Sequence, residues 1–227
     1  ALVSNIALDH QAWLGPDREA IGREKAGIFR PGRPAVIGEP EPPASLLAAA
    51  RAVGALPRRL GHEYRYRRSG NGWDWQGPAG RRGGLPLPPL RGEHQLGNAA
   101  AVLALLDAVA ERLPLSQAAV RQGLLATRLA GRFEVHPGTP TWVLDVAHNP
   151  AAAAVLAANL QGQPCTGRTL AVFGILADKD VAGVLAPLLD KVDSWMLTVP
   201  DDARALPVAQ LAEALHRIAP DRRAVVW

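Results

Sequence analysis

The run from Asp145 to Pro150, DVAHNP, has residue types and spacing that could do chemistry. It lies between an apolar stretch and an alanine-rich one, and in open parallel sheets ligands bind where strands end and helices begin. Asn149 and Pro150 suit the N-cap and first position of a helix, whose free backbone N–H groups favour an anion such as phosphate. The alternative is that Asp145 and Asn149 only make turn and cap hydrogen bonds, with His148 at the surface.

Three further groups contain residues that could act on a ligand. His10, which follows Asp9, could bind a metal ion, and Lys25 comes fifteen residues later. Asn98 stands at the expected start of a helix, and Arg132 lies in a Gly-Arg-Phe-Glu run where a guanidinium could bind phosphate. Each also has an ordinary explanation: a satisfied, partly buried His, an exposed Lys or Arg, and an Asn that only caps its helix.

Apolar periodicity and turn residues predict the elements that carry these groups in the first part of the chain. Aromatic and polar residues alternate on both sides of a Ser-Gly-Asn-Gly turn, which predicts a β-hairpin at 63–76. The Pro- and Gly-rich stretch 77–92 predicts a loop. The other predicted elements are strands at 2–8 and 34–38 and helices at 17–25, 44–53, 97–112 and 116–126.

Strands and helices alternate after a change of composition at 131–141, where Gly and Pro interrupt the pattern. We therefore divide the chain into domains at 1–135 and 136–227. Alternating strands and helices form βαβ units, which close as right-handed crossovers onto a mostly parallel sheet. The predicted fold class is α/β, with a small doubly wound second domain. Its predicted strands are 142–146, 169–175, 194–199 and 223–226, and its helices are 150–160, 181–191 and 207–218.

Lysine is rare in this arginine-rich chain, which has Lys25, Lys179 and Lys191 among 25 basic residues. None of these lysines follows a glycine, so the 227 residues contain no Walker A loop. The composition, 48% apolar and 20% charged, is that of a globular protein, without an apolar run of the ~20 residues that span a membrane. The single Cys165 excludes a disulfide framework and fits a reducing compartment, by default the cytoplasm.

Residues 51–91 contain nine Arg but only Glu63 and Asp74 as acidic residues. Aromatic residues stand among these arginines, an arrangement that binds single-stranded nucleic acid in some proteins. Alternating aromatics on a hairpin more often face the core, and no nucleic-acid motif frames them. We therefore expect no nucleic-acid partner.

Taken together, the motifs resemble the folate branch of the Mur ligase superfamily. Any one motif is weak, but the ordered set covers nearly the whole chain. The cell-wall Mur ligases are similar at the Ala-His-Asn-Pro turn, whereas the Trp-Leu-Gly and Gly-Arg-Glu-Lys-Ala-Gly-Ile stretches look like the folate branch. The matching stretches are Ser4–His10, Trp13–Gly15, Ile21–Ile28, His94–Gln95, Asn98–Ala100, Gly131–Phe133, Asp145–Pro150 and Asp178–Asp180.

The resemblance implies a fold and a reaction. Residues 1–135 would be the carboxy-terminal part of a central ATPase domain, and residues 136–227 a Rossmann-like glutamate-ligase domain. The P-loop half of the family is not matched, so the chain is expected to be part of a longer enzyme and inactive alone. The family forms amides with ATP: a pteroate or folyl carboxylate becomes an acyl phosphate, which the amino group of glutamate attacks.

Site roles are implied in the same way. His10 would be a Mg²⁺ ligand, and Lys25, carbamylated by CO₂, would supply a carboxylate to the metal site. Asn98 would bind the adenine of ATP, Arg132 the phosphates and Asp145 the ribose. His148 would lie near the transferring phosphate as a catalytic residue, and Lys179 is a weaker candidate there.

The implied partners are dihydropteroate, tetrahydrofolate polyglutamates and L-glutamate, with ATP and Mg²⁺ as cofactors. We expect a cytoplasmic monomer that does not bind membranes. Two alternatives stay open. The chain could belong to a cell-wall Mur ligase that adds an amino acid to a UDP-linked precursor, or it could be a non-catalytic module that binds nucleotides or nucleic acid.

Overall fold

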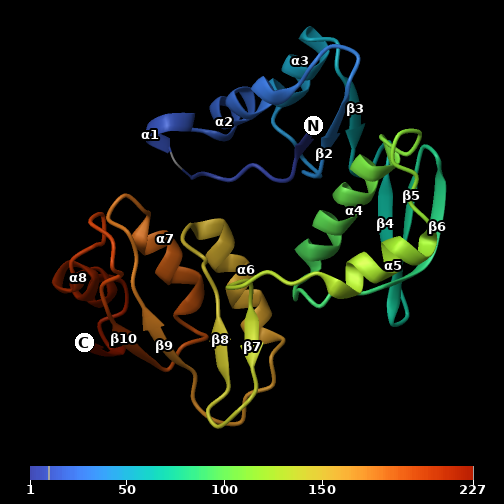
Figure 1. The fold of residues 1–227 in the computed structure, drawn as a ribbon. Coiled ribbons are helices and arrows are strands. Elements are labelled where there is room, and N and C mark those ends of the chain that lie inside the picture. Colours follow the sequence, from blue (N-terminus) through green and yellow to red (C-terminus); the bar gives the residue numbers. More distant parts are fainter. Residues whose placement is uncertain (10, 227) are drawn as a thin grey trace. The chain divides into compact units, whose positions relative to one another are not determined.

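The computed structural model describes residues 1–9 and 11–226 (Figure 1). The chain forms two compact units, Ala1–Leu129 and Ala130–Trp227, which are described separately below. The division falls a few residues before the predicted boundary between 135 and 136. Among the described residues, no helix is both long and apolar enough to cross a bilayer.

A three-stranded parallel sheet opens the first unit, in the order β1 (Leu2–Val3), β2 (Pro34–Ile37) and β3 (Leu56–Arg59). The predicted strand at 2–8 is wrong beyond Val3, because contacts outside the sheet hold the backbone of Ile6, as described below. The sequence analysis missed β3, whose Pro57 is tolerated because this strand lies at the edge. The helices that accompany this parallel sheet are α1 (Gln11–Leu14), α2 (Arg18–Lys25) and α3 (Ala44–Ala52), with a 3₁₀ turn at Ala26–Ile28.

The predicted hairpin at 63–76 is confirmed as β4 (Arg65–Ser69) and β5 (Gly72–Gly77). The loop predicted at 77–92 is wrong in its first half, because β6 (Gly80–Pro86) pairs antiparallel with β5. Its glycines, which indicated a loop, form a β-bulge instead: Gly84 has a φ of 60°.

The inner face of this antiparallel sheet is aromatic. Trp73 and Trp75 are buried against α4 (Glu93–Asp107), and the Trp75 indole N–H donates to the Ala100 carbonyl at 3.1 Å. Helix α4 begins four residues before the predicted position of 97, after Gly92 at a φ of 103°. It also ends earlier than predicted, and α5 (Gln117–Ala126) then follows, one residue shorter than the helix predicted at 116–126, because Ser116 is its N-cap.

The second unit confirms the α/β class with a parallel sheet in the order β11-β10-β9. The helices α6, α7 and α8 contribute to one core with this sheet, around the buried Trp195 and Leu197. The long helix predicted at 181–191 is wrong beyond Leu185, because Pro187 has no backbone N–H and a 3₁₀ turn replaces the α-helix. The bounds are β9 (Leu170–Phe173), β10 (Ser194–Leu197), β11 (Arg223–Val226), α6 (Pro150–Gln161), α7 (Val181–Leu185) and α8 (Val208–Ile218).

A separate antiparallel hairpin precedes these elements. It consists of β7 (Glu134–His136), which the sequence did not predict, and β8 (Trp142–Leu144). β8 ends before the predicted residue 146, so that Asp145 lies directly after the strand. The hairpin therefore places the residues before β7 next to those after β8, since Glu134 pairs with Leu144.

Candidate functional site

A tight turn at Gly131, Arg132 and Phe133 leads into β7. Gly131 and Phe133 have positive φ angles of 65° and 48°, and a positive φ is uncommon for a residue other than glycine. The Phe133 ring is buried, whereas Arg132 is exposed. The Gly131 carbonyl accepts a hydrogen bond from the Val146 N–H at 3.0 Å, and a Cβ at Gly131 would lie 2.7 Å from Val146 Cγ1. A larger residue here would therefore be strained by the positive φ and would have to displace the Val146 side chain.

Two carboxylates hold the backbone of this turn. The Gly131 N–H donates to Glu134 Oε2 at 3.0 Å, and the Phe133 N–H donates to Asp145 Oδ2 at 2.8 Å. The other Asp145 oxygen, Oδ1, accepts from the Ala147 N–H at 2.8 Å. Hydrogen bonds to an ionised carboxylate are stronger than those between neutral groups. Asp145 therefore joins the arginine turn to the loop that follows β8.

That loop ends at the start of α6. The Asn149 carboxamide oxygen accepts from the Ala152 N–H at 2.9 Å and Pro150 follows, so the predicted cap is confirmed. His148 is exposed, and its Nδ1 lies 2.9 Å from the Val146 carbonyl oxygen. In the neutral ring that contact requires the proton on Nδ1. The imidazole thus stands beside a helix N-terminus that favours anions.

Arg132 supplies the positive charge of this region. Among the residues that the structure describes, its guanidinium has no hydrogen-bond or ion-pair partner. The predicted residues Arg132, Asp145 and His148 thus belong to two segments that hydrogen bonds hold together. An arginine turn, a histidine and the start of α6 are parts that can bind a phosphate group.

Lys179, the weaker candidate, follows β9. Its side chain is only 7% exposed, and its Nζ lies 3.6 Å from a carboxylate oxygen of Asp178. The lysine is therefore mostly covered and paired with an acidic neighbour.

In the first unit, the loop after β1 is anchored by residues that the sequence analysis missed. The Ile6 N–H donates to Glu39 Oε2 at 2.7 Å, and the Ile6 carbonyl accepts from Arg18 Nε at 3.1 Å. Arg18 and Glu39 also form an ion pair at 3.4 Å. These two side chains lie 21 positions apart in the sequence, so no local pattern could identify them.

Of the two predicted metal ligands, the structure describes one. His10 is outside the described residues, and Lys25 is exposed at the last position of α2. No three His, Cys, Asp or Glu side chains of the described residues are grouped so that they could hold a metal ion. The described residues alone therefore do not form a magnesium site.

Asn98 does not cap its helix, contrary to one alternative. It lies in the second turn of α4, exposed, and its Nδ2 donates to Gln95 Oε1 at 3.2 Å. Near the start of this helix, a pocket of about 370 Å³ is lined by the loop 87–92 together with Arg68, Glu93 and Leu96. The carboxamide of Asn98 is thus available to a ligand outside the core.

Comparison with known proteins defines the class of the second unit. Residues 131–226 match the family model of the Mur ligase glutamate ligase domain. The matched range begins at the arginine turn and includes nearly the whole second unit. This unit therefore belongs to the Mur ligase glutamate ligase domains.

The chain as a whole is homologous to dihydrofolate synthase/folylpolyglutamate synthase. The enzyme of Escherichia coli K12 is 44% identical over 215 residues, which cover 95% of this chain and 50% of the relative. The enzyme of Mycobacterium tuberculosis is 36% identical over 239 residues, covering 98% and 49%. The chain thus spans about half the length of these relatives.

Solved structures of such enzymes resemble the chain closely. The structure of the E. coli enzyme in complex with DHPP and ADP superposes with a TM-score of 0.89 at 42% identity, covering 100% of this chain and 52% of that one. A bifunctional folylpolyglutamate synthase/dihydrofolate synthase with Mn, AMPPNP and L-glutamate bound gives a TM-score of 0.86 at 44% identity, with 99% and 52% covered. The homology therefore extends through both units.

Proposed function

We propose that this chain takes part in ATP-dependent amide formation between glutamate and a pteroate or folyl carboxylate. An oxygen of that carboxylate attacks the γ-phosphorus of ATP, which gives an acyl phosphate and ADP. The amino group of glutamate then attacks the acyl carbon, and phosphate leaves as the amide forms. The products are ADP, phosphate and a substrate extended by one glutamate.

One observation carries this proposal: the homology covers nearly the whole chain and includes the arginine turn and the DVAHNP loop. The E. coli and M. tuberculosis relatives are both folate enzymes, which favours this reaction over the cell-wall alternative. The nucleic-acid alternative loses its main support, because Trp73 and Trp75 are buried and offer no surface on which bases could stack.

Each site residue has a role in the proposal. Arg132 would neutralise phosphate charge, which is the main demand of phosphoryl transfer. Asp145 already accepts two backbone hydrogen bonds, but each carboxylate oxygen has a second lone pair that a ribose hydroxyl could use. Asn98 would bind the adenine, and His148 Nε2 would face the transferring phosphate and hold or accept a proton there.

His10 and Lys25 would be the residues that bind Mg²⁺. A protonated lysine cannot ligate a metal ion, but reaction of its neutral amine with CO₂ gives a carbamate whose oxygens can. The exposed position of Lys25 gives CO₂ access to the amine. The metal ion would neutralise charge on the ATP phosphates.

The test is ATP hydrolysis by the protein that contains these residues, expressed from its natural coding sequence. We expect turnover that requires both glutamate and dihydropteroate or a reduced folate. Failure of both pteridine substrates to stimulate hydrolysis would contradict the proposal. The 227 residues alone have no Walker A lysine, so we expect them to show no turnover. Rapid turnover by these residues alone would also contradict the proposal.

Lys25→Ala tests the carbamate. We expect activity to fall by about 100-fold or more, because a charge-bearing ligand is removed from the phosphate site. Added bicarbonate should not restore the variant. Arg23→Ala, an exposed position on the same helix, is the control and should retain activity. Wild-type rates for Lys25→Ala would remove the carbamate from the mechanism.

A cytoplasmic monomer remains part of the proposal. Size-exclusion chromatography with light scattering would test the oligomeric state, and a dimer would contradict it.

A further inference from the structure

Glu134 has no role in the chemistry proposed above, but it contacts the arginine turn directly. It is the first residue of β7, and its Oε2 accepts the Gly131 N–H at 3.0 Å. Its other oxygen, Oε1, lies 3.2 Å from Nε2 of His136. Both oxygens are therefore engaged, and neither of them contacts the guanidinium of Arg132.

Asp145 makes the matching contact on the other side of Arg132, through the Phe133 N–H at 2.8 Å. The residues on either side of the arginine are thus each held by a carboxylate, one from the start of β7 and one from the residue directly after β8. Both held residues have a positive φ, which glycine adopts readily but which in Phe133 persists only when the surroundings impose it. The buried Phe133 ring adds a third anchor.

We propose that Glu134 is a positioning residue: with Asp145 it fixes the backbone on both sides of Arg132 and so sets where the guanidinium meets the phosphates of ATP. This inference rests on the proposed function, because it assigns Arg132 to the phosphates. The carboxylates bind backbone amides rather than the guanidinium, so they orient the arginine without forming an ion pair with it. A preorganised charge of this kind need not reorganise when the ligand binds.

A double-mutant cycle tests the proposal on the protein that contains this chain, with the KM for ATP and kcat as readouts. Arg132→Ala is expected to raise the KM for ATP about 100-fold, and Glu134→Ala about 10-fold. The double variant should be no worse than Arg132→Ala, because Glu134 acts only through that arginine. Glu134→Gln retains an acceptor for the Gly131 N–H and should stay within about threefold of the unaltered enzyme.

Asp193→Ala is the matched control. Its Oδ2 accepts the Thr169 N–H at 2.7 Å in the same unit, so the variant removes the same type of bond away from the arginine turn. We expect its KM for ATP to be unchanged. Should Glu134→Ala fail to fold, Glu134→Asp, with a side chain one methylene shorter, takes its place in the cycle.

The outcomes separate this inference from the proposed function. Additive effects of Arg132→Ala and Glu134→Ala, or an unchanged KM in Glu134→Ala, would overturn the positioning role while leaving Arg132 in place. An unchanged KM in Arg132→Ala would instead remove the arginine from the phosphate site and the inference with it. Loss of activity in Glu134→Gln equal to that in Glu134→Ala would also count against positioning through the backbone.

Discussion

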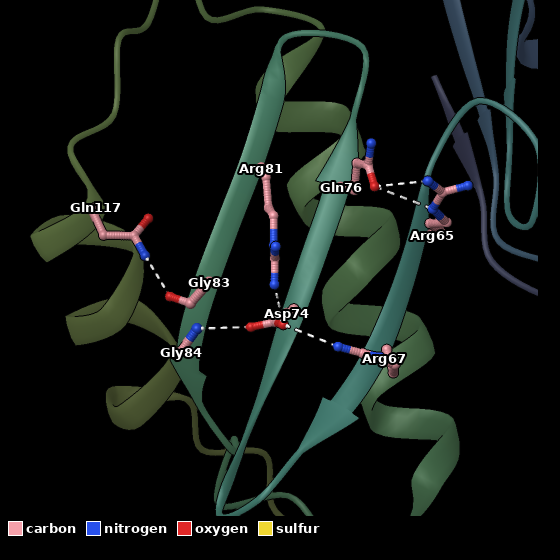
Figure 2. A network of polar contacts seen from close by, with 8 residues as sticks. All are labelled: Arg65, Arg67, Asp74, Gln76, Arg81, Gly83, Gly84 and Gln117. Atoms are coloured by element: carbon pink, nitrogen blue, oxygen red, sulfur yellow. Dashed lines mark hydrogen bonds and ion pairs between the residues drawn. The ribbon is translucent and has the colours of Figure 1, made fainter.

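The bulge in the antiparallel sheet and the arginine turn both contain glycine, arginine and a carboxylate that accepts a backbone N–H. They differ in whether the carboxylates also contact the arginines. At the bulge, Asp74 Oδ1 accepts the Gly84 N–H at 2.9 Å, while Oδ2 lies 2.6 Å from Arg81 and 3.9 Å from Arg67 (Figure 2). At the turn, by contrast, the carboxylates bind only backbone amides and a histidine, and Arg132 is left exposed. One arrangement therefore neutralises its arginines, and the other leaves an arginine without a carboxylate partner among the described residues.

The contacts at the bulge have a structural purpose. The Gly84 N–H, and then Arg81, hold the pKa of Asp74 below its ordinary value. The bulge also turns the Gly83 carbonyl toward α5, where it accepts from Gln117 Nε2 at 3.2 Å, and Arg121 donates to the Gly84 carbonyl (Figure 2 shows Gln117). The number of arginines in a region therefore does not indicate a binding site. Whether each arginine is paired with a carboxylate is more informative.

The strongest test of this comparison exchanges the arginines for alanine. Arg132→Ala should lower kcat/KM for ATP about 100-fold, as lost stabilisation of phosphate charge. Arg81→Ala removes an arginine that is also exposed but paired, and steady-state assays should show kcat/KM for ATP within about twofold of the unaltered enzyme. Equal losses in the two variants would mean that the presence or absence of a carboxylate partner does not separate the two regions.

A smaller effect is expected from replacing the glycine of each region with alanine. Gly131 and Gly84 have φ angles of 65° and 60°, so alanine at either should cost about 1 kcal/mol of unfolding free energy. A Cβ at Gly84 meets no atom within 4 Å, but one at Gly131 would press on Val146 at 2.7 Å. We therefore expect Gly131→Ala, but not Gly84→Ala, to raise the KM for ATP as well.

Denaturant unfolding and steady-state kinetics on the same two preparations would check this. A raised KM in Gly84→Ala, or an unchanged KM in Gly131→Ala, would show that the turn geometry does not control nucleotide binding.

The sequence was sufficient for the parts of this comparison that depend on local patterns. The cap at Asn149, the hairpin around the Ser-Gly-Asn-Gly turn and the alternation after residue 141 all follow from residue types a few positions apart. The motif order was also enough to identify the folate branch. Local patterns failed where glycine has two uses: the glycines of β6 indicated a loop and instead form a bulge within a strand.

The contacts that position the site could not be predicted in this way. Asp145 meets Phe133 across twelve positions, and Glu39 meets Ile6 across 33. Such pairs depend on which strands become neighbours, and β7 was not predicted at all. The sequence therefore indicated which charged residues are candidates for the site but not which residues hold them.

In the pair Glu63 and Arg59, one carboxylate binds both a backbone N–H and a guanidinium. This pair gives the smallest predicted change, which is in the free energy of unfolding. Glu63 accepts from the Arg59 backbone N–H at 2.7 Å and from its guanidinium at 2.8 and 3.1 Å. The side-chain hydrogen bond from Arg59 is the main reason that the pKa of Glu63 falls to about 2 from 4.5. Because the folded-state pKa is lowered, the stabilisation is complete above about pH 4.5 and is lost as the pH falls toward 2.

The pair is partly exposed, with 34% of the Glu63 side chain accessible, so solvent screening limits its contribution to about 1 kcal/mol or less. Urea unfolding of the chain between about pH 6 and about pH 2 should show this loss. Glu63→Gln should remove that part of the pH dependence, and Arg59→Met should shift it toward the ordinary carboxyl pKa. If Arg59→Met left the pH dependence unchanged, the backbone N–H alone would hold the carboxylate, and Glu63 would belong with Glu134 and Asp145 rather than with Asp74.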